Sequence, residues 1–101
     1  MLAKISIFPV GKGESLSAYV ARAVEYIIKE AKKSGTKYEL TSMGTMIEGR
    51  FDDVWRILKG CHEVMKKYSN RVYITIEIDD RKGKSDAITY KKEKIRRILS
   101  S

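Results

Sequence analysis

The fold of this chain is constrained most by the order of two hydrophobic patterns along the sequence. Apolar residues alternate with polar ones in segments 2–10, 37–48 and 71–79, which is the spacing of half-buried strands. Between these segments apolar residues recur every three or four positions, as in amphipathic helices. Gly44 interrupts the middle segment and is expected to mark a bulge or tight corner between strands Lys37 to Met43 and Thr45 to Glu48. The sequence therefore predicts an α+β fold of order β-α-β-β-α-β, with two helices on one face of an antiparallel sheet.

Each predicted helix has a candidate N-cap. Ser15 or Ser17 is expected to cap the first helix and Asp52 the second. Asp86 is expected to cap an additional C-terminal helix, in which a narrow apolar stripe lies against a strongly basic face. Gly60 lies inside the second helix, where glycine costs about 1 kcal/mol relative to alanine. We therefore expect a close packing partner at Gly60.

The strand alternation predicts one sheet face that the helices leave open. The residues expected on this open face are Lys4, Ser6, Phe8, Glu39, Thr41, Met43, Tyr73, Thr75 and Glu77. They mix hydroxyl, aromatic and acidic side chains, a composition too apolar for a plain solvated surface. Another subunit or a ligand is expected to cover this face.

Composition limits the class of protein. A chain of 101 residues with 43% hydrophobic and 34% charged residues is typical of a single globular domain. The net charge is +8, but residues 81–101 hold eight of the 21 Lys and Arg residues and two of the 13 Asp and Glu residues. No apolar run approaches the roughly 20 residues of a membrane span. The only cysteine, Cys61, has no internal disulfide partner, so the cytosol is the expected compartment.

Catalytic and metal-binding patterns are weak. His62 directly follows Cys61 on a predicted helix, so their side chains diverge and do not form a nucleophile pair. Cys61 is interpreted as a buried hydrophobic residue and His62 as a surface or inter-subunit residue. Asp79-Asp80 beside Arg81 is interpreted as an ion-paired turn. We therefore predict no catalytic residue, no metal and no cofactor.

Two further functions remain open. The fold order is shared by RNA-recognition modules, but strand 71–79 offers one exposed aromatic residue, Tyr73, and then Glu77, which repels phosphates. A basic patch on the last helix is the remaining candidate contact for nucleic acid; it comprises Lys91, Lys92, Lys94, Arg96 and Arg97. The second alternative is a purely structural or regulatory oligomer whose open face serves association alone.

Several motifs, spread over nearly the whole chain, belong together. They are Ile7 to Gly11, Ser15 to Val20, Tyr38 to Gly49 with its Gly-Thr-Met-Ile-Glu-Gly ending, Cys61 to Glu63, and Ile76 to Arg81. In combination they resemble the small thiamine-binding protein family. The resemblance implies a ferredoxin-like fold and assembly into dimers or tetramers through sheet faces and edges. It also implies non-catalytic binding of thiamine or its hydroxymethylpyrimidine part.

The resemblance directs attention to hydroxyl and carboxylate side chains. The expected ligand contacts are Ser15 and Ser17 at the start of the first helix, and Thr41, Thr45 and Glu48 in the central motif. An aminopyrimidine needs apolar walls and polar partners for its nitrogens, and a carboxylate would favour the cationic thiazolium. A phosphate on the ligand would need the helix start or a lysine. Each contact also has a structural alternative, such as capping for the serines.

Overall fold

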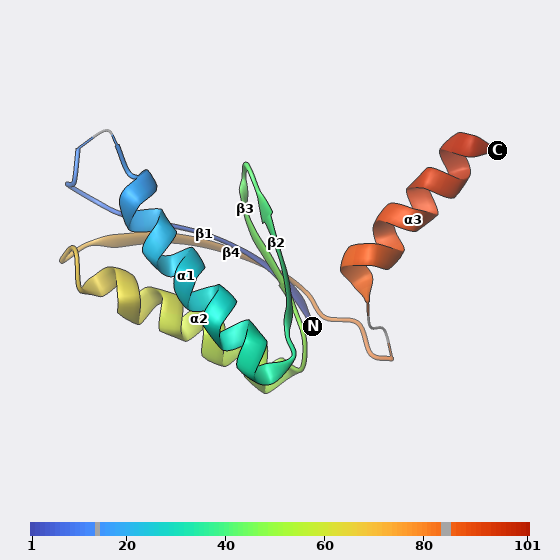
Figure 1. The fold of residues 1–101 in the computed structure, drawn as a ribbon, viewed down its shortest axis with the longest axis horizontal. Helices are drawn as coiled ribbons and strands as arrows, with labels where there is room; N and C mark the ends of the chain where they lie inside the picture. Colours follow the sequence, from blue (N-terminus) through green and yellow to red (C-terminus); the bar gives the residue numbers. More distant parts are fainter. Residues whose placement is uncertain (14, 84–85) are drawn as a thin grey trace.

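The structure is a computed structural model that describes residues 1–13, 15–83 and 86–101. Its elements are β1 (Leu2–Pro9), α1 (Ser17–Ser34), β2 (Lys37–Thr41), β3 (Gly44–Glu48), α2 (Phe51–Lys66), β4 (Val72–Asp79) and α3 (Ala87–Ser100) (Figure 1). This order confirms the predicted β-α-β-β-α-β arrangement with a C-terminal helix. The middle strand segment ends at Thr41 rather than Met43, which lies in the turn before β3.

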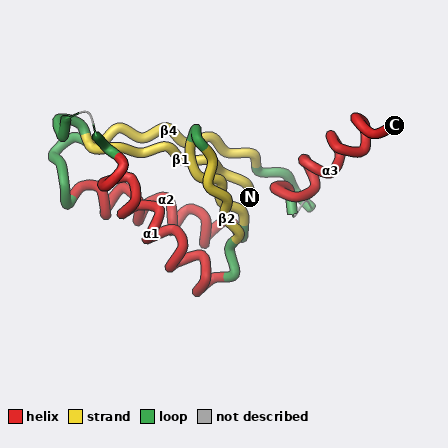
Figure 2. The backbone as a smooth tube through the Cα atoms, turned by 45° about the horizontal axis from the view of Figure 1, so that its top comes forward, coloured by secondary structure: helices red, strands yellow, loops and turns green. Residues whose placement is uncertain are grey.

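The strands pair antiparallel in the order β2-β3-β1-β4. β3 therefore lies between β1 and β2, the two strands that α1 connects, and β1 lies between β3 and β4, which α2 connects. Both α1 and α2 cover the same face of the sheet (Figure 2). This is the split β-α-β topology of the ferredoxin-like fold.

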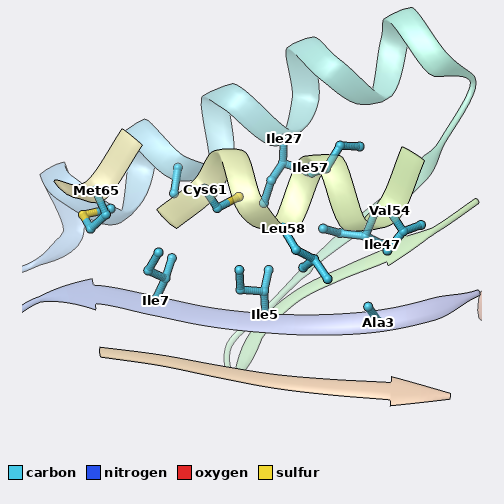
Figure 3. Packing of buried hydrophobic residues seen from close by; sticks show 11 residues of the cluster. Ala3, Ile5, Ile7, Ile27, Ile47, Val54, Ile57, Leu58, Cys61 and Met65 are labelled. Carbon is cyan, nitrogen blue, oxygen red and sulfur yellow. The ribbon is translucent and has the colours of Figure 1, made fainter. Parts of the chain in front are cut away.

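The core lies between this inner sheet face and the two helices. β1 contributes Ala3, Ile5 and Ile7, and β3 contributes Ile47 (Figure 3). The helical side of the core consists of Ala23, Ile27, Val54, Ile57, Leu58, Cys61 and Met65. Burial raises the pKa of the Cys61 thiol to about 12, so the side chain is uncharged at neutral pH. Cys61 is thus the small buried hydrophobic residue that the sequence predicts.

The open face carries the predicted alternation. Phe8 stacks on Tyr73 with ring centroids 5.4 Å apart, and Lys4 pairs with Glu77 at 2.7 Å between Nζ and Oε1. Ser6 lies opposite Thr75 in the register of β1 and β4. The face is therefore held by aromatic and ionic pairs across neighbouring strands.

The N-cap predictions are wrong for the first two helices. Leu16, not Ser15 or Ser17, occupies the N-cap position of α1, and α2 begins at Phe51 after Arg50. Neither cap position makes a side-chain hydrogen bond to the described helix. Ser17 is already the first helical residue, and Leu16 has φ of −99° and ψ of −7° rather than the extended backbone typical of a capping residue. Asp52 instead lies in the acidic first turn of α2, where the helix dipole favours it.

Two glycines have the close neighbours that their positions predict. Gly44 has φ of 142°, and a Cβ there would lie 2.8 Å from the Ile5 carbonyl oxygen, so this position requires glycine. The turn itself lies at Ser42 and Met43, and Gly44 is the first residue of β3, paired with Thr41, rather than a corner before it. Gly60 faces Tyr26 of α1, whose phenol ring occupies the space of a Cβ. The tyrosine is the packing partner expected from the cost of a helical glycine.

Helix α3 projects from one end of the molecule (Figures 1 and 2). No residue of α3 is buried, and the molecule extends 48 × 28 × 19 Å along its principal axes. Asp86 stands at the N-cap position with φ of 57°, but its side chain makes no capping hydrogen bond and pairs with Lys37 instead. Within the described ranges, no helix has the length and apolar character needed to cross a bilayer.

Candidate functional site

A groove of about 490 Å³ lies between the first half of α1 and the β2–β3 hairpin. Its floor comes from the inner face of β1 and β3, and its rim comes from the hairpin turn. The size falls within the range of small-molecule sites, about 300 to 1,000 Å³. We name it the hairpin groove.

Aliphatic side chains form the walls of the hairpin groove. Val20 and Val24 come from α1, Leu16 is its N-cap residue, and Leu40 comes from β2. Leu40 is 56% exposed although it points to the inner face of the sheet, because α1 does not reach over the end of the hairpin. None of the described residues lining the groove is charged. The groove therefore suits a flat, neutral ring rather than an ion.

Thr45 supplies a polar group to the floor of this apolar groove. The register places it opposite Ile5 and Leu40, on the inner face, and it is only 6% exposed. Its hydroxyl makes no hydrogen bond to any of the described residues. No buried side-chain polar atom among the described residues lacks a partner, so this hydroxyl is open to the groove, where it can donate to, or accept from, a ligand.

Thr41 also lines the groove, but its hydroxyl has local partners. Thr41 Oγ1 donates to the Gly44 carbonyl oxygen at 2.6 Å and accepts from the Met43 amide at 3.2 Å. These bonds close the hairpin turn and fix the rim of the groove. A threonine at this place thus has a structural role whether or not a ligand contacts it.

Ser15 and Ser17 are not among the described residues that line the groove. Both are exposed, and they flank Leu16, whose side chain lines the groove. The structure therefore brings Thr41 and Thr45 together in the groove, and it places the two serines only beside a lining residue. A ligand contact of each remains a prediction.

Glu48 lies elsewhere. It is three residues from Thr45 on the same strand, so its side chain points to the opposite face of the sheet. Its carboxylate accepts hydrogen bonds from the backbone amides of Ala87 at 2.6 Å and Ile88 at 3.1 Å, and it thereby caps α3. Glu48 also lines a cavity of about 200 Å³ beneath α3. The predicted site is thus divided between the two faces of the sheet, and a ligand contact of Glu48 stays a prediction.

The other titratable groups show no catalytic arrangement. Asp79 pairs with Lys91 of α3, and this hydrogen bond and charge lower the pKa of the carboxyl. The positive charge of Arg81, the partner that the sequence predicts, also lowers this pKa, but by less. In the part of the chain that the structure describes, no three His, Cys, Asp or Glu side chains gather at metal-binding distance. His62 is exposed on α2.

Sequence reasoning missed the apolar walls of the groove. Leu40 carried a signal, because its alternation with Glu39 and Thr41 places it on the inner face. Leu16 carried one as well, since it is the apolar residue between two serines at the start of a helix. Neither signal shows by itself that the core leaves a side chain uncovered.

Comparisons with known proteins agree with this fold. The family model described as thiamine-binding protein matches residues 3–96. A UPF0045 protein of Methanothermobacter thermautotrophicus is 40% identical over 100 residues, covering 92% of this chain and 97% of the relative. The UPF0045 protein YqgV of Bacillus subtilis is 34% identical over 100 residues, covering 97% of this chain and 96% of the relative.

Solved structures show the same architecture. The crystal structure of a Methanocaldococcus jannaschii protein superimposes with a TM-score of 0.82 at 37% identity, covering 94% of each chain. A Thermotoga maritima protein, for which a role in thiamine biosynthesis or salvage has been proposed, superimposes with a TM-score of 0.73 at 22% identity. That alignment covers 91% of this chain and 96% of the other, and it supports the fold alone. From the family model and these relatives, the chain belongs to the thiamine-binding protein family.

Proposed function

We propose that this protein binds thiamine, through its hydroxymethylpyrimidine part, without catalysing a reaction. The observation that carries the proposal is the Thr45 hydroxyl, which has no partner among the described residues and lies on the floor of a groove whose described lining is uncharged and largely aliphatic. An aminopyrimidine is flat, its faces are apolar, and its edge carries nitrogens that need hydrogen-bond partners. The family model adds thiamine as the ligand.

The described lining of the groove is uncharged, and this determines how the ligand is oriented. The thiazolium ring of thiamine is cationic, and no carboxylate among the described residues lines the groove. Burial of an unpaired cation is costly, so the thiazolium remains at the open mouth. There Ser15 and Ser17 are the proposed contacts, while Thr41 and Thr45 serve the pyrimidine. The pyrimidine alone should therefore retain most of the affinity.

Thr45→Val tests the site. Valine keeps the shape of threonine but removes the hydroxyl, and the loss of one hydrogen bond of roughly 1–1.5 kcal/mol should weaken thiamine binding about tenfold. Isothermal titration calorimetry with thiamine and with hydroxymethylpyrimidine measures this. Thr75→Val on the open face is the matched control and should bind like the wild type. Wild-type protein that releases no heat with either compound at millimolar concentration would refute the proposal.

We further propose that copies of the chain assemble into dimers or tetramers in the cytosol. β4 is an edge strand, and Tyr73, Ile76 and Ile78 on it are 55%, 38% and 41% exposed. Strand edges with apolar side chains favour pairing with another chain. Light scattering on purified protein should give a mass of at least twice 11.6 kDa, and a monomer at micromolar concentration would contradict this assembly.

A further inference from the structure

Four basic side chains converge where the β1–α1 loop meets the turn between α2 and β4. They line a cavity of about 500 Å³ and are Lys12, Lys66, Lys67 and Arg71. No acidic residue is among the described residues that line it. We name this cavity the basic pocket. It lies outside the hairpin groove and away from the basic face of α3.

Among the described residues, most of this positive charge has no counter-charge. The side chains of Lys12, Lys67 and Arg71 make no ion pair or hydrogen bond with the described residues. Lys66 Nζ donates to the Asn70 carbonyl oxygen at 3.0 Å, a neutral partner. On α3, by contrast, Lys91 and Lys92 are each paired with a carboxylate. Like charges gathered without an anion repel one another, so an anion bound among them would relieve the repulsion.

The backbone around the basic pocket is held in place. The Val10 amide donates to the Arg71 carbonyl oxygen at 2.8 Å, and Ser69 Oγ donates to the Val10 carbonyl oxygen at 2.8 Å. Tyr68 packs edge-on against Tyr19 of α1, with ring centroids 5.5 Å apart. The loop and the turn are thus fixed relative to each other, which lowers the entropy cost of binding an ion between them.

Among the described residues around the pocket, the C-terminus of α2 supplies an opposing partial charge. Its dipole is equivalent to roughly half a negative elementary charge, and it lies beside Lys67 at the C-cap. Four basic side chains outweigh this. We propose that the basic pocket is a phosphate site, which takes a phosphate monoester or a diphosphate.

The position of the pocket relates it to the hairpin groove. Ile7 and Phe8 of β1 line the groove, and Val10 and Gly11 in the turn after β1 line the basic pocket, so the chain passes from one cavity to the other. Three residues span at most about 11 Å, so Phe8 and Gly11 lie no farther apart than this. A ligand with its ring in the groove can then reach the pocket with a phosphate. This second statement rests on the proposed function, whereas the phosphate site itself does not.

Binding of inorganic diphosphate tests the basic pocket independently of the hairpin groove. Calorimetry on the full chain should show binding that weakens as salt rises. The double variant K12A/K67A should bind diphosphate at least about tenfold more weakly. The matched control K29A/K59A removes two exposed lysines outside the basic pocket and should bind like the wild type at equal ionic strength. Thermal unfolding of both variants checks that they are folded. Equal affinity of K12A/K67A and K29A/K59A would overturn the proposal.

Binding of thiamine diphosphate distinguishes a phosphate carried by the thiamine ligand from a separate inorganic phosphate. If one ligand spans both cavities, it binds more tightly than thiamine, and K12A/K67A removes the gain while leaving thiamine affinity unchanged. Diphosphate binding without any thiamine binding supports the phosphate site and refutes the proposed function. Thiamine binding without affinity for inorganic diphosphate or gain from the diphosphate ester refutes the phosphate site alone. Tighter, length-dependent binding of single-stranded RNA through Lys12 and Lys67 would also overturn it, in favour of a nucleic-acid surface.

Discussion

Replacing Gly60 with valine is expected to lower the free energy of unfolding by about 2–3 kcal/mol. A side chain at this position overlaps the phenol ring of Tyr26, so the ring must leave its place between α1 and α2. Valine is a better helix former than glycine, but this gain is below about 1 kcal/mol. Displacing a packed aromatic ring costs more, because overpacking alone costs roughly 1–3 kcal/mol. Urea unfolding followed by circular dichroism measures the difference.

Tyr26 provides the test of the cause. In a Tyr26→Ala background the ring is absent, and Gly60→Val should then cost far less than in the wild type. Lys59→Val, at the neighbouring exposed position of α2, controls for helix propensity and should change stability by less than about 0.5 kcal/mol. Equal costs of Gly60→Val with and without Tyr26 would show that the ring contact does not decide the effect.

The sequence predicts the order of elements because the two hydrophobic periods are clean in β1, α1, α2 and β4. It is less informative about helix ends, where several residues of capping type stand close together. Ser15, Ser17 and Asp52 all have suitable side chains, yet the backbone places Leu16 and Arg50 at the caps. Near the start of α2, Arg50 Nε instead donates a hydrogen bond to Asp53 Oδ2 at 2.9 Å. Capping thus depends on the path of the preceding loop, which single residues do not encode.

The candidate site was predictable only in part. Thr41 and Thr45 could be selected as hydroxyl residues, but the face of Thr45 depends on where pairing resumes after Gly44. The same alternation places Thr45 and Glu48 on opposite faces of the sheet, although both residues belong to one sequence motif. Lys12 and Arg71 are about 60 positions apart and meet only through the pairing of β1 with β4. Charges so distant in sequence do not form a visible cluster, so the basic pocket had no signal in the sequence.

The docking of α3 is an electrostatic arrangement. Glu48 on β3 accepts the first two amides of the helix, Lys92 pairs with Glu39 on β2, and Lys91 pairs with Asp79 on β4. The pKa of Asp79 is lowered by Lys91. The pair therefore stabilises the folded state fully at a pH above the usual pKa of an aspartate, and this stabilisation is lost as the pH falls through the lowered pKa. No apolar residue of α3 is buried. Removing one charge should therefore loosen the helix as a whole.

Glu48→Ala is expected to release α3 from the sheet while leaving the core intact. Loss of a cap costs about 1–2 kcal/mol, and the loss of charge-assisted bonds to two backbone amides brings the total to about 2–3 kcal/mol. Amide hydrogen exchange in 87–100 should accelerate roughly 30- to 150-fold, with little change in α1 and α2. Mass spectrometry after peptic digestion resolves these segments.

Glu77→Ala is the matched control for this release. Glu77 lies on the open face like Glu48, is bonded to Lys4, and has no described contact with α3. Its loss removes the same charge from the sheet but leaves both helix amides capped. Equal exchange rates of α3 in the two variants would show that the net charge of the sheet, not the Glu48 cap, holds the helix. If Glu48→Ala leaves exchange in α3 unchanged, the ion pairs of Lys91 and Lys92 suffice to hold it. An intermediate rate for Glu48→Gln would support the cap, because glutamine keeps an acceptor oxygen but loses the charge that strengthens both bonds.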